Sequence, residues 1–127
     1  MIRAVADTSI FVAQEGGRPL GELPDELAVS VVTAAELELG VLRAKTADVR
    51  ATRLATLVRV RTAYPLLPVD DAVASCFARL ADEQLERGCK PRRHDTWIAA
   101  VALRHGVAVV TQDEDFAGFV SVEVLRA

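Results

Sequence analysis

Residues 2–12 have the sequence IRAVADTSIFV. The apolar residues at the start of this stretch predict a short strand over residues 2–6, which ends at Asp7. Thr8 and Ser9 are residue types that cap helices, so we expect a helix to start there and to contain the apolar residues that follow. A strand that leads directly into a helix is the repeating unit of α/β folds.

The rest of the chain continues this alternation of strands and helices. Thr33 and Glu36 have the Thr-x-x-Glu spacing of a capping box, which predicts that Thr33 caps a helix starting near Ala34. The expected elements after the first helix are a loop over 16–25, a strand over 27–32, helices over 34–45 and 48–62, an edge segment over 66–69, a helix that Asp70 caps and Gly88 ends, a helix over 94–105, and strands over 107–111 and 120–124. This order predicts a three-layer α/β/α sandwich with a mainly parallel central sheet, formed by a single domain over residues 1–127.

The composition excludes several classes of protein. Hydrophobic residues make up 51% of the 127 residues and charged residues 26%, which is not the composition of a disordered chain. No apolar run approaches the roughly 18 residues that a membrane-spanning helix needs. The two cysteines are too few for a disulfide framework or a cysteine-rich zinc site. The first residues lack the apolar run of a secretory signal, so we expect a cytoplasmic protein without a membrane segment.

The charge balance limits how the protein could bind nucleic acid. Fifteen lysines and arginines face 18 aspartates and glutamates, which gives a formal net charge of −3. This value argues against binding through bulk positive charge. It does not exclude a protein that holds cations over a cluster of acids, because bound metal ions reverse the local electrostatics.

Four acidic residues stand at junctions between predicted strands and helices. They are Asp7, Glu36, Asp95 and Asp113. In parallel α/β sheets, ligands bind beyond the carboxyl ends of the strands, so the fold could bring these side chains together. Each acid alone also has an ordinary structural interpretation, as a turn residue, a capping residue or a partner of a helix dipole.

Asp95 is the most informative of the four acids. It shares a predicted helix face with Ile98, Ala99 and Ala102, and no lysine or arginine follows it at i+3 or i+4. A carboxylate beside a buried apolar face needs a partner, which a metal ion or the N–H groups of its own helix start would supply. Clustered carboxylates select Mg²⁺ or Mn²⁺, and such ions serve phosphoryl chemistry.

Four segments of the chain form a pattern when they are taken in order: VADTS at 5–9, AAELELG at 34–40, DTWIAA at 95–100 and VTQDEDF at 110–116. Together they resemble the PIN domain, and more narrowly the VapC-type toxins of toxin–antitoxin pairs. The resemblance implies a Mg²⁺- or Mn²⁺-dependent endoribonuclease that hydrolyses phosphodiester bonds in RNA. It also implies a homodimer and inhibition by a small VapB-like antitoxin.

The resemblance implies roles for individual residues. The metal ligands would be Asp7, Asp95 and Asp113, and Glu36 would complete the catalytic cluster. The supporting residues would be Thr8, Ser9, Thr111 and Asp115. The family often has asparagine directly before the third acid, whereas this chain has His94.

The residues themselves suggest a surface for the substrate. Arg92 and Arg93 directly precede the helix that contains Asp95, so we expect them to bind RNA phosphates. Two other functions remain open at this point. The chain could be a PIN-like scaffold that binds RNA or protein without cutting. It could also be a phosphoacceptor receiver domain, although that class needs an acid pair after the first strand and a lysine after a late one.

Overall fold

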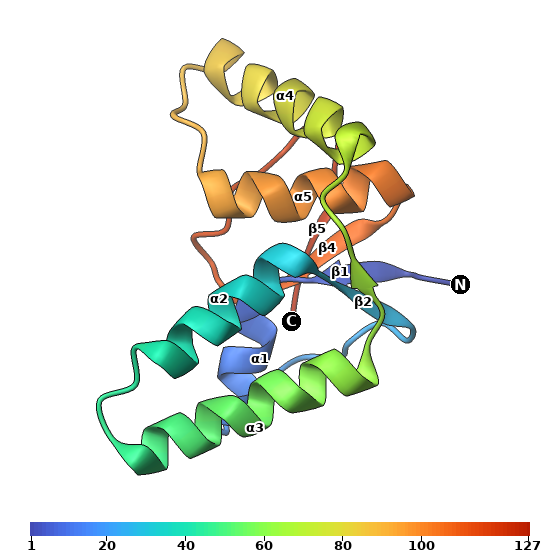
Figure 1. Cartoon of the computed structure of the whole chain (residues 1–127). Coiled ribbons are helices and arrows are strands. Elements are labelled where there is room, and N and C mark those ends of the chain that lie inside the picture. The colour runs from blue at the N-terminus through green and yellow to red at the C-terminus, as the bar shows by residue number, and fades with distance from the viewer.

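The computed structural model describes all 127 residues and has five strands between two layers of helices (Figure 1). The strands are β1 (Ala4–Ala6), β2 (Leu27–Ser30), β3 (Leu66–Leu67), β4 (Ala108–Thr111) and β5 (Val124–Arg126). The helices are α1 (Thr8–Glu15), α2 (Val31–Leu42), α3 (Ala47–Ala63), α4 (Asp71–Glu86) and α5 (Arg93–His105). No helix combines the length and the apolar character needed to cross a membrane.

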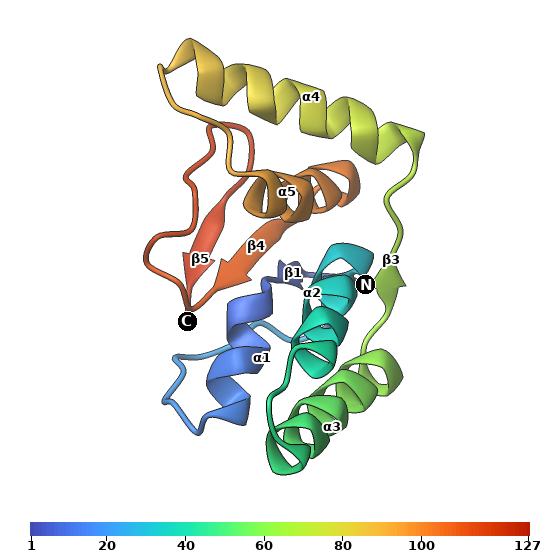
Figure 2. The same cartoon turned by 60° about the vertical axis from the view of Figure 1, so that its left-hand side comes forward.

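The sheet has the strand order β3-β2-β1-β4-β5, and every neighbouring pair is parallel. Helices α4 and α5 lie on one face of the sheet, and α1, α2 and α3 lie on the other (Figure 2). The predicted three-layer α/β/α sandwich is therefore confirmed. The expected edge position of β3 is also correct, as Pro68 follows this strand and cannot donate to a further neighbour.

Alternation of side chains along the strands divides the core into two parts. On β1, Val5 packs toward α4 and α5, whereas Ala4 and Ala6 pack toward α1, α2 and α3. The same alternation places Val109 and Val110 of β4 on opposite faces. Because successive side chains of a strand point to opposite faces, a strand buried on both sides is apolar throughout.

Helix α5 is the best-buried helix of the fold. Its residues from Ile98 to Ala102 are all at most 1% exposed, and the three alanines among them let the helix lie close to its neighbours. On its outer side, Trp97 stacks on Phe77 of α4, with ring centroids 4.0 Å apart. This packing fixes the first turn of α5, where Asp95 lies.

Two expected boundaries are wrong. Ser30 caps α2 and accepts a hydrogen bond from the Thr33 amide, so Thr33 lies inside the first turn and does not form the expected capping box with Glu36. The last strand is β5 at Val124–Arg126 rather than 120–124. Of the alternating valines, Val122 is buried in the core beside α4 and α5, whereas Val120 is 75% exposed.

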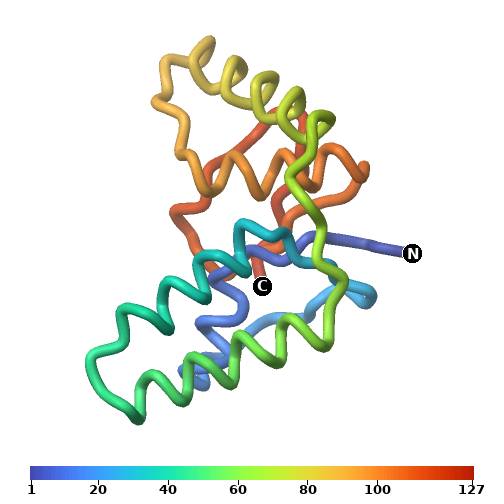
Figure 3. The backbone as a smooth tube through the Cα atoms, viewed as in Figure 1, coloured from blue at the N-terminus to red at the C-terminus, as the bar shows by residue number.

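The strand order places a crossover point at β1. After β1 the chain builds β2 and β3 on one side, and it returns to build β4 and β5 on the other (Figure 3). Ligands of open α/β sheets bind where the strand order reverses in this way. Asp7 directly follows β1 and Asp113 lies just after β4, so both acids stand at this point of the fold.

Candidate active site

Asp7 is the most deeply buried acid of the site. Its residue is 6% exposed, and it caps α1 at the end of β1. Its Oδ2 atom accepts hydrogen bonds from the Thr111 hydroxyl at 2.9 Å and from the Ser9 amide at 3.4 Å. Because buried carboxylates are unfavourable without partners, these bonds help to hold Asp7 in place. The expected helix start at Thr8 is confirmed, but Asp7 is the capping residue.

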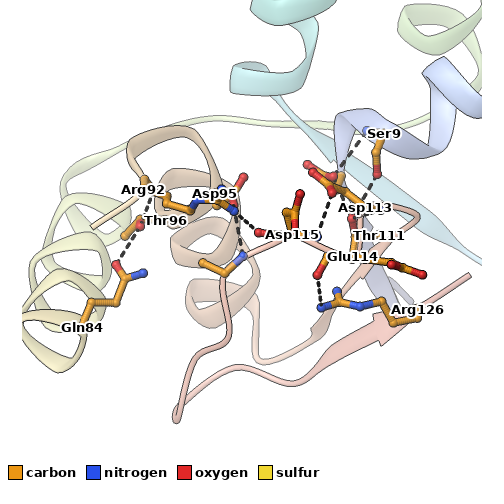
Figure 4. Close-up of polar contacts among 12 residues, drawn as sticks. Ser9, Gln84, Arg92, Asp95, Thr96, Thr111, Asp113, Glu114, Asp115 and Arg126 are labelled. Atoms are coloured by element: carbon orange, nitrogen blue, oxygen red, sulfur yellow. Dashed lines mark hydrogen bonds and ion pairs between the residues drawn. The ribbon is translucent and has the colours of Figure 1, made fainter. Parts of the chain in front are cut away.

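Hydroxyl groups join the start of α1 to the end of β4 beside the site (Figure 4). The hydroxyls of Thr111 and Ser9 lie 3.0 Å apart. Since the single hydroxyl proton of Thr111 goes to Asp7, Ser9 is the donor in this pair. Ser9 in turn accepts from the Gln112 amide at 2.9 Å, and Thr111 accepts from the Asp113 amide at 3.1 Å. The network thus fixes the backbone from which Asp113 projects.

Glu36 projects from α2 and is half-buried. Its Oε1 atom accepts from the Thr8 hydroxyl at 2.9 Å, and its Oε2 atom lies 3.5 Å from Nδ1 of His94. The Thr8 hydroxyl also lies 3.0 Å from that of Thr33. Burial raises the pKa of Glu36, and the charges of Asp7 and Asp95 raise it further, while Thr8 and His94 oppose this shift. Glu36 is therefore held close to the other acids despite their repulsion.

Asp95 lies in the first turn of α5. Burial raises the pKa of this carboxyl, and the charges of Asp7 and Asp113 add to the increase. Its Oδ2 atom accepts from the Ala117 amide at 3.1 Å and lies 3.7 Å from Nη1 of Arg92. These two contacts lower the pKa but do not cancel the effect of burial and like charge.

Asp113 and Asp115 lie in the exposed loop after β4. The Asp115 amide donates to Oδ1 of Asp113 at 2.8 Å, and the Asp115 carbonyl accepts from the Arg92 guanidinium (Figure 4). A hollow of about 370 Å³ opens above this region. Its lining consists of Arg92, Arg93, His94, Asp95 and Asp113. Arginines and carboxylates thus face the same open space.

The structure brings all four predicted acids into one electrostatic cluster. Glu36 feels the charges of Asp7 and Asp95, and Asp95 feels those of Asp7 and Asp113. The predicted supporting residues also lie here, since Thr8, Ser9 and Thr111 all bond within the cluster. No three histidine, cysteine or acidic side chains are grouped so as to hold one metal ion together.

Sequence reasoning missed two contacts of the site. The partner of Asp95 is not at i+3 or i+4 but at i−3, where Arg92 lies 3.7 Å from its carboxylate. The sequence predicted Thr33 as a helix cap, whereas in the structure its hydroxyl group contacts that of Thr8. The Arg92 contact could have been found from i−3 spacing, because residues three apart on a helix are neighbours in either direction.

Comparison with known proteins agrees with this geometry. The model of the PIN domain family matches residues 4–120. The chain belongs to the PIN domain family. It is 51% identical to ribonuclease VapC5 of Mycobacterium tuberculosis, over 96% of this chain and 93% of the relative. It is 41% identical to ribonuclease VapC4 of the same organism, over 97% and 95%.

A solved structure supports the same family at the level of the fold. It is the crystal structure of a member of the VapBC family of toxin–antitoxin systems, VapBC-5 from Mycobacterium tuberculosis. The match covers 100% of both chains, with a TM-score of 0.87 and 47% identity. These comparisons place this PIN domain in the VapC group.

Proposed function

We propose that this protein is a metal-dependent endoribonuclease and the toxin of a toxin–antitoxin pair. The observation that carries the proposal is that Asp7, Glu36, Asp95 and Asp113 lie near the crossover point of the sheet, within range of one another's charges. The relatives named VapC5 and VapC4 are ribonucleases, which supports RNA as the substrate. Membership of the PIN domain family argues against the phosphoacceptor receiver hypothesis.

The donor set of the site fits a hard divalent cation. Magnesium is usually held by one or two carboxylates, and water molecules complete its octahedron. Asp7, Asp95 and Asp113 would hold Mg²⁺ or Mn²⁺ in this way, directly or through water. This mode agrees with four carboxylates that influence one another although no three converge as a closed cage. When bound, the ion would neutralise developing charge on the phosphate oxygens and activate water.

The side chains of the protein would supply orientation and charge. Glu36 would orient the attacking water, because Thr8 fixes its Oε1 atom and leaves Oε2 on the side of His94. Thr111 and Ser9 would keep Asp7 in one rotamer by hydrogen bonding. Arg93 would contact phosphate groups of the RNA above the carboxylates, since it lines the same hollow. Attack at phosphorus would then break one P–O ester bond of the RNA backbone.

Cleavage of total cellular RNA by the purified protein tests the proposal. We expect discrete fragments with Mg²⁺ or Mn²⁺, and none with EDTA or with the Asp95→Asn variant. Asp82→Asn is the matched control, because Asp82 is exposed on α4 and lies outside the acidic cluster. Total RNA is used so that the assay does not presuppose a target.

Each failure of this assay has a distinct meaning. Fragments that persist in Asp95→Asn would contradict the placement of the active site. A wild-type protein that binds metal by calorimetry but cuts no RNA would favour the scaffold hypothesis. Loss of metal binding in Asp7→Asn would show that the carboxylates hold the ion whether or not cleavage is seen.

The partners of the protein form a second part of the proposal. The similar solved structure belongs to the VapBC toxin–antitoxin family, which supports a VapB-like antitoxin as partner. Apolar side chains are exposed on α2 and α3, with Leu39 57% and Leu42 71% exposed. Such residues are typical of surfaces that another chain covers. We also propose a homodimer, which light scattering of the isolated protein tests directly.

A further inference from the structure

A second hollow lies next to the one above the carboxylates and differs from it in charge. Its volume is about 230 Å³, and it lies between the connection from α4 to α5 and the loop that follows Asp115. The lining residues are Gln84, Arg87, Cys89, Lys90, Arg92, Ala117 and Gly118. Three of these are cationic and none is acidic. In a protein of net charge −3, this concentration of positive charge is a local feature that the overall charge conceals.

The cations of this hollow have free hydrogen-bonding capacity. Arg87 and Lys90 form no ion pair, and Arg92 forms one, at 3.7 Å, with Asp95. Nη1 of Arg87 donates to the Gly118 carbonyl at 3.3 Å, and Nη1 of Arg92 donates to the Asp115 carbonyl. A guanidinium has five N–H donors, so each arginine is anchored through one nitrogen and can still bind an anion. Anchoring also reduces the side-chain entropy that is lost when an anion binds.

Arg92 connects this hollow to the active site. It lines both the second hollow and the hollow above Asp95 and Asp113. An RNA strand with its reacting phosphate above the carboxylates can therefore place another phosphate of the same strand beside Arg87 and Lys90. The connection from α4 to α5 that contains these residues lies at one end of the helical layer (Figure 3).

We infer that the second hollow is a phosphate-binding subsite for the RNA strand, formed by Arg87, Lys90 and Arg92. The inference rests on the proposed function, since it extends the same substrate beyond the reacting bond. It also divides the basic loop by role. Arg93 lines only the hollow above the carboxylates, and Arg87 and Lys90 line only the second hollow. Arg92 lines both hollows.

Binding of fluorescent single-stranded RNA in EDTA tests this subsite without any cleavage step. In single-stranded RNA each phosphate contact contributes about −0.7 to the slope of log K against log salt, which corresponds to about fivefold in Kd at ~0.1 M salt. We expect the double variant Arg87→Gln/Lys90→Gln to weaken binding at least about fivefold and to reduce the slope by about 0.7 or more. The measurement covers ~50 to ~200 mM salt.

A double variant of equal charge provides the control. Arg79→Gln/Lys45→Gln removes one arginine and one lysine that are exposed and line neither hollow. We expect its affinity and salt slope to stay within about twofold of the wild-type values, because its charges lie outside the proposed contacts. Equal losses in both double variants would overturn the subsite, because the effect would then be one of net charge.

The single variant Lys90→Gln distinguishes a loss of RNA binding from a loss of folding. Arg87 holds the Gly118 carbonyl, so its replacement could disturb the loop, whereas Lys90 forms no ion pair and is exposed. Lys90→Gln should retain the wild-type melting temperature and lose part of the affinity and salt slope. Unchanged binding in both Lys90→Gln and the double variant would overturn the inference and leave the proposed function standing. A wild-type protein that binds no RNA in EDTA would overturn the subsite, whereas the proposed function is tested separately by the cleavage assay with Mg²⁺ or Mn²⁺.

Discussion

Removal of one buried hydroxyl group should weaken both the fold and the site. In Thr111→Val the side chain keeps its shape but loses the bond to the Asp7 carboxylate and the bonds from Ser9 and from the Asp113 amide. A hydrogen bond to a charged group contributes about 1.5–3 kcal/mol to stability and a neutral one about 0.5–1.5 kcal/mol. The Asp113 amide lies in an exposed loop and can bond to water instead. We therefore expect a loss of about 3 kcal/mol in the free energy of unfolding.

The assays for Thr111→Val are thermal unfolding and RNA cleavage. For a chain of this size, ~3 kcal/mol corresponds to a fall of about 10 °C in Tm. Loss of a hydrogen-bonding partner of a metal ligand typically costs about 10–100-fold in activity, and the proposed role of Asp7 as a ligand predicts that range here. Thr111→Ser keeps the hydroxyl and should recover most of the activity.

Thr62→Val is the matched control for this substitution. Thr62 is exposed on α3, and its hydroxyl bonds only to carbonyls of its own helix. Its replacement should change stability by no more than about 0.5 kcal/mol. If Thr111→Val were as stable and as active as Thr62→Val, the hydroxyl network would not be what holds Asp7, and the reasoning would be refuted.

Three other predictions follow from burial, charge and the proposed metal ion. The pKa of Asp95 is raised, so the folded protein binds this proton more tightly than the unfolded chain, and stability falls as pH rises through that pKa. In EDTA, Asp95→Asn should therefore have a higher Tm than the wild type at pH 7, and melting curves should converge below about pH 4. Addition of Mn²⁺ to ~100 times its Kd should stabilise the wild type by about 2.7 kcal/mol, and a smaller rise in Tm for Asp113→Asn would identify that residue as a ligand. Leu80→Ala should cost about 2–5 kcal/mol in chemical denaturation, because Leu80 is fully buried, whereas Leu85→Ala on the exposed side of α4 should cost far less.

The sequence was sufficient for the order of the elements and for most of the site. Asp70 caps α4 as expected, with a 2.9 Å bond from the Val73 amide, because a polar cap and an apolar stripe at helical spacing act together there. The boundary at α2 could not be predicted in the same way. Ser30 and Thr33 are both good caps, and the parallel pairing with β3, whose last pair joins Ser30 to Leu67, places the end of the strand at Ser30.

The residues of the site could be predicted from the sequence, but the hydrogen bonds between them could not. Asp7 and Thr111 are separated by 104 residues, and their bond depends on β1 and β4 being neighbours in the sheet. The crossover of the chain is a property of the whole fold, so no local pattern reveals it. Residue types and junction positions therefore predicted which side chains form the cluster, but not which atoms hold each carboxylate.

The site combines two opposing contributions to stability. Burial and mutual repulsion raise the pKa values of Glu36 and Asp95, so these two ionised carboxylates oppose folding near pH 7. The bonds of Thr111 and Thr8 to Asp7 and Glu36 oppose that effect and fix the geometry. We therefore expect Asp95→Asn to raise the free energy of unfolding and Thr111→Val to lower it, and the proposed function predicts that both substitutions reduce cleavage. A surface without function would have no reason to keep charges that weaken the fold, so this opposition is the physical signature expected of an active site.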